Sequence, residues 1–73
     1  MTFVVIFERG PTSVGAYVPD LPGCVAVGDT LEEAQALITE AMQMHLEGMQ
    51  EDGELLPLPV SSVIDITLPP FAA

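Results

Sequence analysis

The sequence predicts a single α+β domain in which one long helix packs on one face of an antiparallel sheet. Short runs of β-branched and aromatic residues alternate with turn residues over the first 28 positions, a strong helix start follows, and an alternating apolar segment lies near the end. With 73 residues and 7.7 kDa the chain has room for one domain. The predicted order is β-β-β-α-β, with a core over about residues 2–68 and a tail over 69–73.

The first two predicted strands form a hairpin. Residues 2–8 contain the apolar run Phe3 to Phe7, which is too short for an ordinary helix and rich in strand-forming side chains. Turn residues occupy positions 9–13, and residues 14–18 then alternate as a second strand. The two strands are close enough in sequence to pair antiparallel.

A stiff connection leads to the third predicted strand. Residues 19–23 contain two prolines, which lack an amide donor and push the preceding residue out of the helical region. The third strand covers residues 24–27 and ends at Gly28. Three consecutive antiparallel strands are therefore expected.

The clearest local signal is the capping box that begins at Thr30. The Thr30 hydroxyl can accept from the amide of Glu33, while the Glu33 carboxylate can accept from the amide of Thr30. Good helix formers continue to about Asp52, and Gly53 is suited to close the helix. The apolar stripe expected to face the sheet consists of Ala34, Leu37, Ile38, Ala41, Met42, His45, Leu46 and Met49.

The last predicted element is a half-buried fourth strand that begins at Ser62. Residues 54–59 form a proline-stiffened, extended connection before it. From Ser62 onward apolar and polar positions alternate, and two prolines stop the pattern after Leu68. The two predicted faces are Ile64, Ile66 and Leu68 on one side and Val63, Asp65 and Thr67 on the other.

Charge and hydropathy bound the class of function. Eleven acidic residues face one basic residue, Arg9, and the formal net charge of −10 repels phosphate backbones, so direct nucleic-acid binding is not expected. The same charge favours a basic protein partner, although acidity also serves solubility alone, and charge by itself does not choose between these interpretations. Because 49% of the residues are hydrophobic and no disulfide or metal staple is visible, we expect a dimer or higher oligomer. The single cysteine and the absence of a leader or a membrane-length apolar run predict a cytoplasmic protein.

Three sequence blocks resemble the HicB family of antitoxins. They are "YVPDLPGC" at residues 17–24, "GDTLEEA" at 28–34, and "HLEG" at 45–48 followed by "EDGE" at 51–54. The resemblance covers roughly residues 3–60 and implies a truncated ribonuclease-H-like fold. It also implies a partner, a small basic HicA-type toxin that cleaves mRNA and that the antitoxin holds inactive. Many family members carry a DNA-binding segment after this core, and because the chain ends at Ala73 we expect a stand-alone core domain.

Two other functions compete with that interpretation. One is an orphan HicB-like regulatory or scaffold domain that binds another protein or a small ligand. The other is a degenerate nuclease, but the carboxylates of Asp20, Asp29 and Asp65 lie in a turn, beside a helix cap and in an apolar strand, which is a poor pattern for two-metal chemistry. His45 is interpreted as a packed or interfacial side chain, since no second histidine and no cysteine lies at ligand spacing. Cys24 is interpreted as a small buried hydrophobic residue, since no nearby basic group lowers the pKa of its thiol. We therefore predict no enzyme, no cofactor and no metal.

The candidate partner contacts lie on one turn and one helix face. Asp20 and Leu21 are interpreted as exposed contact points on a rigid turn, or as a corner that the two prolines fix. The helix supplies carboxylates that either form a partner-binding stripe or a solvated face: Glu40, Glu47 and Glu51.

Overall fold

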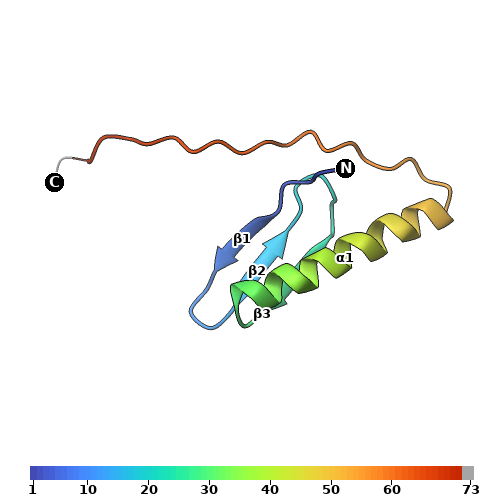
Figure 1. The fold of residues 1–73 in the computed structure, drawn as a ribbon, viewed down its shortest axis with the longest axis horizontal. Helices are drawn as coiled ribbons and strands as arrows, with labels where there is room; N and C mark the ends of the chain where they lie inside the picture. Colours follow the sequence, from blue (N-terminus) through green and yellow to red (C-terminus); the bar gives the residue numbers. More distant parts are fainter. Residues whose placement is uncertain (72–73) are drawn as a thin grey trace.

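The computed structural model describes residues 1–71 and contains three strands followed by one helix, as Figure 1 shows. The sheet has the order β1-β2-β3, with both neighbouring pairs antiparallel. This confirms the α+β class and the predicted order of the first four elements. Their bounds are Ile6–Arg9 for β1, Val14–Tyr17 for β2, Val25–Gly28 for β3 and Leu31–Glu51 for α1.

The strands are short because their pairing stops where β2 ends. Arg9 pairs with Val14 at one end of the hairpin and Ile6 with Tyr17 at the other. After Tyr17 the chain enters the loop that leads to Cys24, so residues 2–5 have no strand beside them. The strand predicted over residues 2–8 therefore begins only at Ile6, and it continues one residue beyond its predicted end, to Arg9.

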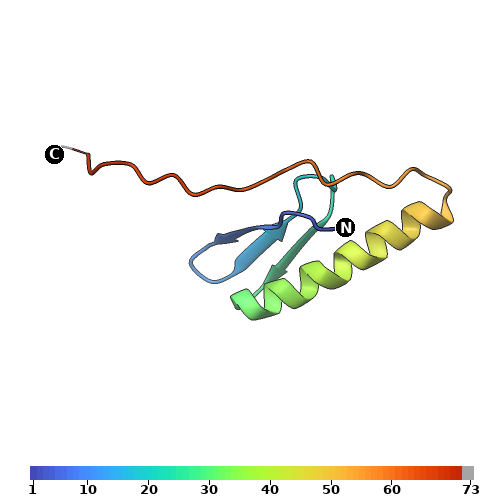
Figure 2. The same ribbon diagram turned by 45° about the horizontal axis from the view of Figure 1, so that its top comes forward.

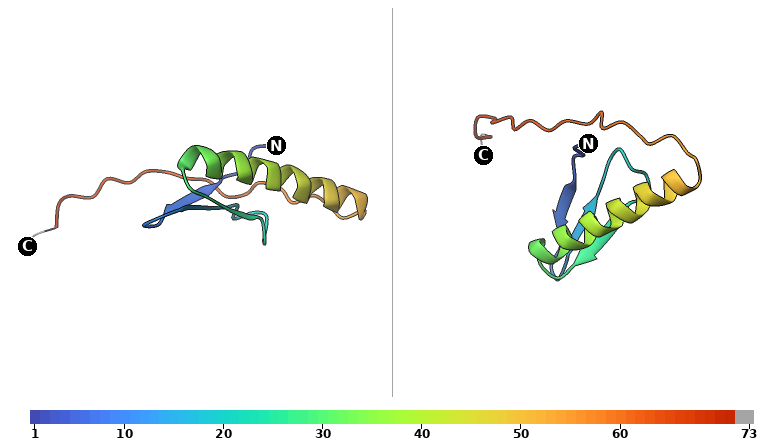
Figure 3. Two further views of the ribbon diagram at one scale, coloured as in Figure 1. Left: turned by 90° about the horizontal axis from the view of Figure 1, so that it is seen from below. Right: turned by 45° about the vertical axis from the view of Figure 1, so that its right-hand side comes forward.

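The helix lies across β3 and β2 on one face of the sheet (Figures 2 and 3). A close approach at Gly28 makes this possible, because a Cβ atom there would lie 2.7 Å from the backbone nitrogen of Ala34. Ala34 itself is fully buried. A glycine at the end of β3 and an alanine in the first turn of α1 thus allow the chain to reverse directly from sheet to helix.

The predicted cap is present at the start of α1. The Glu33 amide donates to the Thr30 hydroxyl oxygen over 3.1 Å, whereas the Glu33 carboxylate accepts from the amide of Asp29, over 3.2 Å, rather than from the Thr30 amide. At the other end Asp52 caps the helix, and Gly53 follows with a φ of 71°. Both helix ends were therefore placed by local sequence signals, within one residue.

The predicted apolar stripe of α1 is buried only in its first half. Ala34 and Ile38 are buried, while Leu37 remains 39% exposed. A helix of 21 residues is roughly 31 Å long, whereas a strand of four residues spans about 13 Å, so the second half extends past the strands. There the stripe is half-buried, at Ala41, Met42, His45, Leu46 and Met49.

The predicted fourth strand is wrong as a description of the single chain, because residues 54–71 form neither helix nor strand. They run as an extended segment away from the end of α1 and out beyond the sheet (Figure 1). Ile64 and Ile66, expected on a buried face, are 77% and 72% exposed. The alternating pattern specifies an extended conformation with two faces, but no edge of this chain's own sheet lies beside the segment. Of the predicted tail over 69–73, Ala72 and Ala73 lie outside the described residues.

Candidate protein-binding surface

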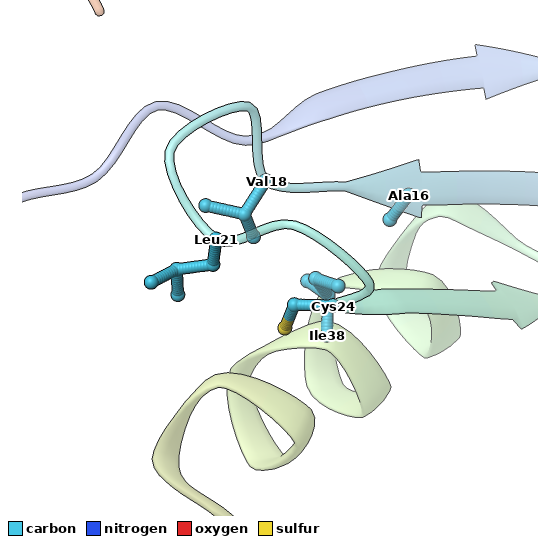
Figure 4. Close-up of a cluster of buried hydrophobic side chains, with 5 residues drawn as sticks. All are labelled: Ala16, Val18, Leu21, Cys24 and Ile38. Carbon is cyan, nitrogen blue, oxygen red and sulfur yellow. The ribbon is translucent and has the colours of Figure 1, made fainter. Parts of the chain in front are cut away.

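The loop between β2 and β3 folds over the end of the core. Three backbone hydrogen bonds close it: the Val18 amide donates to the Cys24 carbonyl over 3.3 Å, the Leu21 amide to Val18 over 3.1 Å, and the Cys24 amide to Leu21 over 3.0 Å. Val18, Leu21 and Cys24 join Ala16 and Ile38 in the buried cluster that Figure 4 shows. Leu21 is 1% exposed, so the expectation that it offers an exposed contact is wrong. Burying such a side chain contributes on the order of 2 kcal/mol, which explains why it turns inward.

Asp20, the neighbour of Leu21, faces the other way and holds the extended chain after α1 at Val60 and Ser61. Its carboxylate accepts hydrogen bonds from the amides of Val60 and Ser61, over 3.0 and 2.9 Å, and from the Ser61 hydroxyl over 2.9 Å. The Ser61 amide bond is the main reason why the pKa of Asp20 is lowered; partial burial opposes it, and the other two bonds reinforce it. Asp20 therefore has a role within the chain, which we call the Asp20 clamp, and its role in partner binding stays a prediction.

The three candidate carboxylates of α1 are all exposed and lie on one side of the helix. At 3.6 residues per turn, Glu40, Glu47 and Glu51 fall within about 80° of the circumference together with Leu37 and Met44. Met44 is 64% exposed. The helical periodicity predicts Leu37 in the core and does not single out Met44, although Met44 lies four residues after Glu40 and three before Glu47. We call these five residues the Glu-Met stripe.

A shallow, open pocket of about 380 Å³ borders this stripe where α1 crosses the start of β3. Of its lining residues, Cys24 is 4% exposed, and burial raises the pKa of its thiol. Val25, another lining residue, is 64% exposed. The pocket is lined by Gly23, Cys24, Val25, Ala41, Met44 and His45. The apolar rim and the adjacent carboxylates together form a surface suited to a partner with both apolar and cationic side chains.

The chain's only Lys or Arg is remote from that surface. Arg9 lines a second open pocket, of about 450 Å³, between the β1-β2 turn and the residues that begin α1. Asp29 and Glu32 line the same pocket. The Glu-Met stripe consequently has no Lys or Arg within the chain to offset its charge.

Within residues 1–71, no three His, Cys, Asp or Glu side chains come together as a possible metal site. Asp29 and Asp65, considered above for two-metal chemistry, are therefore not assembled with Asp20 into such a group. None of the described helices has the length and apolar character needed to cross a membrane.

Comparison with known proteins places the chain in a family. The family model described as "HicB_like antitoxin of bacterial toxin-antitoxin system" matches residues 3–70. An uncharacterised 14.9 kDa protein from the rep-hol intergenic region of Haemophilus phage HP1 is 44% identical over 57 residues, which are 78% of this chain and 43% of that protein.

Two UPF0150 proteins are similar as well. The one from Helicobacter pylori is 35% identical over 52 residues, 71% of this chain and 72% of its own length. The one from Synechocystis is 40% identical over 42 residues, 58% of this chain and 53% of its own length. Thus the chain spans about half the length of two of these three relatives. On the family match and the fold together, this chain belongs to the HicB-like antitoxins of bacterial toxin-antitoxin systems.

Proposed function

We propose that the chain acts in the cytoplasm as the antitoxin of a type II system, binding and neutralising a small basic HicA-type toxin that cleaves mRNA. The family match supports a toxin partner. The observation that carries the proposal further is the Glu-Met stripe, which offers carboxylates and apolar side chains side by side on one rigid helix. The chain acts by covering its partner and needs no catalytic group of its own.

Electrostatics supports a cationic partner. Eleven acidic side chains face a single Arg, so most carboxylates have no Lys or Arg partner within the chain. Such a field accelerates encounter with a basic protein and disfavours acidic ones. A ribonuclease must present cationic side chains to RNA phosphates. Carboxylates that pair with those cationic side chains prevent RNA from binding to the same surface.

Apolar contacts supply the rest of the affinity. Met44 is 64% exposed and Leu37 39% exposed, so both can bury further area against a partner, at roughly 25 cal/mol per Å². Methionine adapts its shape to a facing surface because its side chain is unbranched and flexible. The carboxylates around these two residues then act mainly on the rate and specificity of association.

Co-expression tests the proposal. The chain is expressed with the protein encoded by the adjacent reading frame, which the proposal expects to be short and basic, and growth is compared with expression of that protein alone. We expect rescue of growth and a purified complex whose association slows as salt rises. Continued growth arrest together with no complex at low salt contradicts the proposal.

A pair of charge-matched variants locates the surface. Glu40→Gln with Glu47→Gln and Thr12→Lys with Gln35→Lys both raise the net charge by two, but only the first pair changes the Glu-Met stripe. All four positions are exposed. We expect the stripe variant to lose about tenfold in affinity, which is about 1.4 kcal/mol, and the control to lose much less. Equal losses would mean that net charge acts and the stripe does not.

A further inference from the structure

Residues 62–68, which we call the C-terminal segment, have the composition of a strand but no sheet. Val63, Ile64, Ile66 and Leu68 are between 63% and 77% exposed, so both alternating faces are in solvent. In the described part of the chain, no backbone hydrogen bond joins the segment to the rest of the fold. An isolated extended strand with this much apolar surface is not stable in water without a partner.

The accessible surface and the radius of gyration are both larger than those of a compact protein of this size. The accessible surface is 5719 Å², whereas a compact protein of 7.7 kDa exposes about 4,300 Å². The radius of gyration is 15.2 Å against about 11 Å for a compact domain of this length. The excess of about 1,400 Å² per chain, doubled in a pair of chains, exceeds the 1,200 to 2,000 Å² that a standard interface buries.

The direction of the segment is fixed at its start. Pro57 and Pro59 are half-buried, and the Asp20 clamp holds Val60 and Ser61 against the core. Beyond Ser61 the extended chain continues out past the sheet, as Figures 1 and 2 show. The segment therefore extends away from its own sheet, where a second molecule could contact it.

Within residues 1–71, the outer edge of β1 is unpaired and could accept a strand such as the C-terminal segment. β1 is one of the two edge strands of the sheet, and in the described chain residues 2–5 before it also lack a partner strand. Because α1 packs over β3 and β2, the side chains of Phe3, Val5 and Phe7 are only half-buried. Residues 3–9 supply a seven-residue edge for the seven residues of the C-terminal segment. The edge of β3 is less suitable, because this strand, although as long as β1, follows the closed loop that ends at Cys24 and turns at Gly28 straight into the helix.

We propose that the C-terminal segment of each chain adds as a fourth strand to the β1 edge of a second copy, giving a reciprocal homodimer. Ile64, Ile66 and Leu68 then cover Phe3, Val5 and Phe7, and Asp65 faces solvent. A second copy fits better than a toxin, because the segment carries a single charge, Asp65, whereas a basic toxin is matched by the acidic stripe. An exposed apolar strand of this kind promotes aggregation unless it is buried whenever the chain is folded. A second copy of the same chain is the one partner that is present whenever the chain itself is present.

Light scattering on the purified 73-residue chain, without any toxin, tests the dimer. We expect a mass of twice 7.7 kDa at micromolar concentration. Ile66→Asp and Leu55→Asp make the same chemical change at two exposed positions, 72% and 93% exposed, one inside the C-terminal segment and one before it. We expect Ile66→Asp to halve the mass with the helical circular dichroism retained, and Leu55→Asp to remain dimeric.

Two further measurements separate strand exchange from other dimers. Slow hydrogen exchange at the amides of residues 63–68, lost in Ile66→Asp, is expected only for a paired strand. In a mixed sample of labelled and unlabelled chains, intermolecular contacts should join Ile64 or Ile66 to Phe3, Val5 or Phe7. A chain that stays monomeric at millimolar concentration overturns the proposal, as does a dimer that survives Ile66→Asp with residues 63–68 unprotected. Because no toxin takes part, neither result bears on the function proposed above.

Discussion

Two stretches of this chain share an alternating pattern and end in different structures. Residues 14–17 form β2, paired on both sides, with Val14 and Ala16 buried. Residues 62–68 alternate as regularly and remain extended and exposed. The difference is that β2 has neighbours next to it in sequence, whereas the C-terminal segment is directed away from every edge of its own sheet. An alternating pattern specifies conformation and faces, while the partner strand decides whether a sheet forms.

The two regions differ most in the exposure of their leucine side chains, and we expect the largest mutational effect there. Leu21 is 1% exposed in the core and Leu55 is 93% exposed in the extended segment. Leu21→Ala should lower the free energy of unfolding by about 2 to 5 kcal/mol, because it removes a buried side chain and leaves a cavity. Leu55→Ala should change it by less than about 0.5 kcal/mol. Urea unfolding of both variants measures the difference, and similar losses would show that the extended segment contributes to the core.

A glycine pair tests the tight junction of sheet and helix. Gly28→Ala places a Cβ atom 2.7 Å from a backbone nitrogen, which cannot move without the helix, so we expect a loss of about 1 to 3 kcal/mol. Gly48→Ala, inside α1, meets nothing within 4 Å and should stabilise the protein by about 0.5 to 1 kcal/mol. Thermal unfolding reports both signs. A neutral Gly28→Ala variant would mean that the helix can shift away from β3.

A threonine pair tests the local signal that starts the helix. Thr30→Ala removes the acceptor for the Glu33 amide and should cost about 1 kcal/mol. Thr39→Ala removes only a bond from a mid-helix hydroxyl to the Gln35 carbonyl, and the gain in helix propensity should offset that loss. Denaturant midpoints of the two variants compare them directly, and equal losses would argue against a special role for the cap.

The smallest effect on core stability is expected at the Asp20 clamp, which joins the two regions. Since the pKa of Asp20 is lowered in the folded chain, the clamp is present above the ordinary aspartate pKa and is lost as pH falls through the folded value. The amide signals of Val60 and Ser61 should report that transition, and Asp20→Asn should make their hydrogen exchange faster at neutral pH. Ser61→Ala, which keeps both amide bonds, serves as the control. An Asp20 pKa at or above the ordinary value would contradict the clamp.

Sequence reasoning succeeded where a signal is local. The cap at Thr30 and the closure at Gly53 depend on neighbours within four residues, and both were located. It failed at Leu21 and at the C-terminal segment, because both outcomes depend on distant parts of the molecule. Two prolines predict a corner at residues 19–23, but they do not say which side chain turns inward. Similarly, the exposure of Met44 depends on which side of the helix the sheet leaves uncovered, which periodicity does not contain.

Asp20 and Leu21 are adjacent in sequence and act in opposite directions. Leu21 is anchored among buried side chains, and the same short loop presents the Asp20 carboxylate to Val60 and Ser61. Loosening the packing around Leu21 would therefore turn the Asp20 carboxylate away from the Val60 and Ser61 amides that donate to it, and would release the extended segment. The loop between β2 and β3 thus couples the buried cluster to the extended segment. How tightly Leu21 is packed affects how readily residues after Ser61 can bind other molecules.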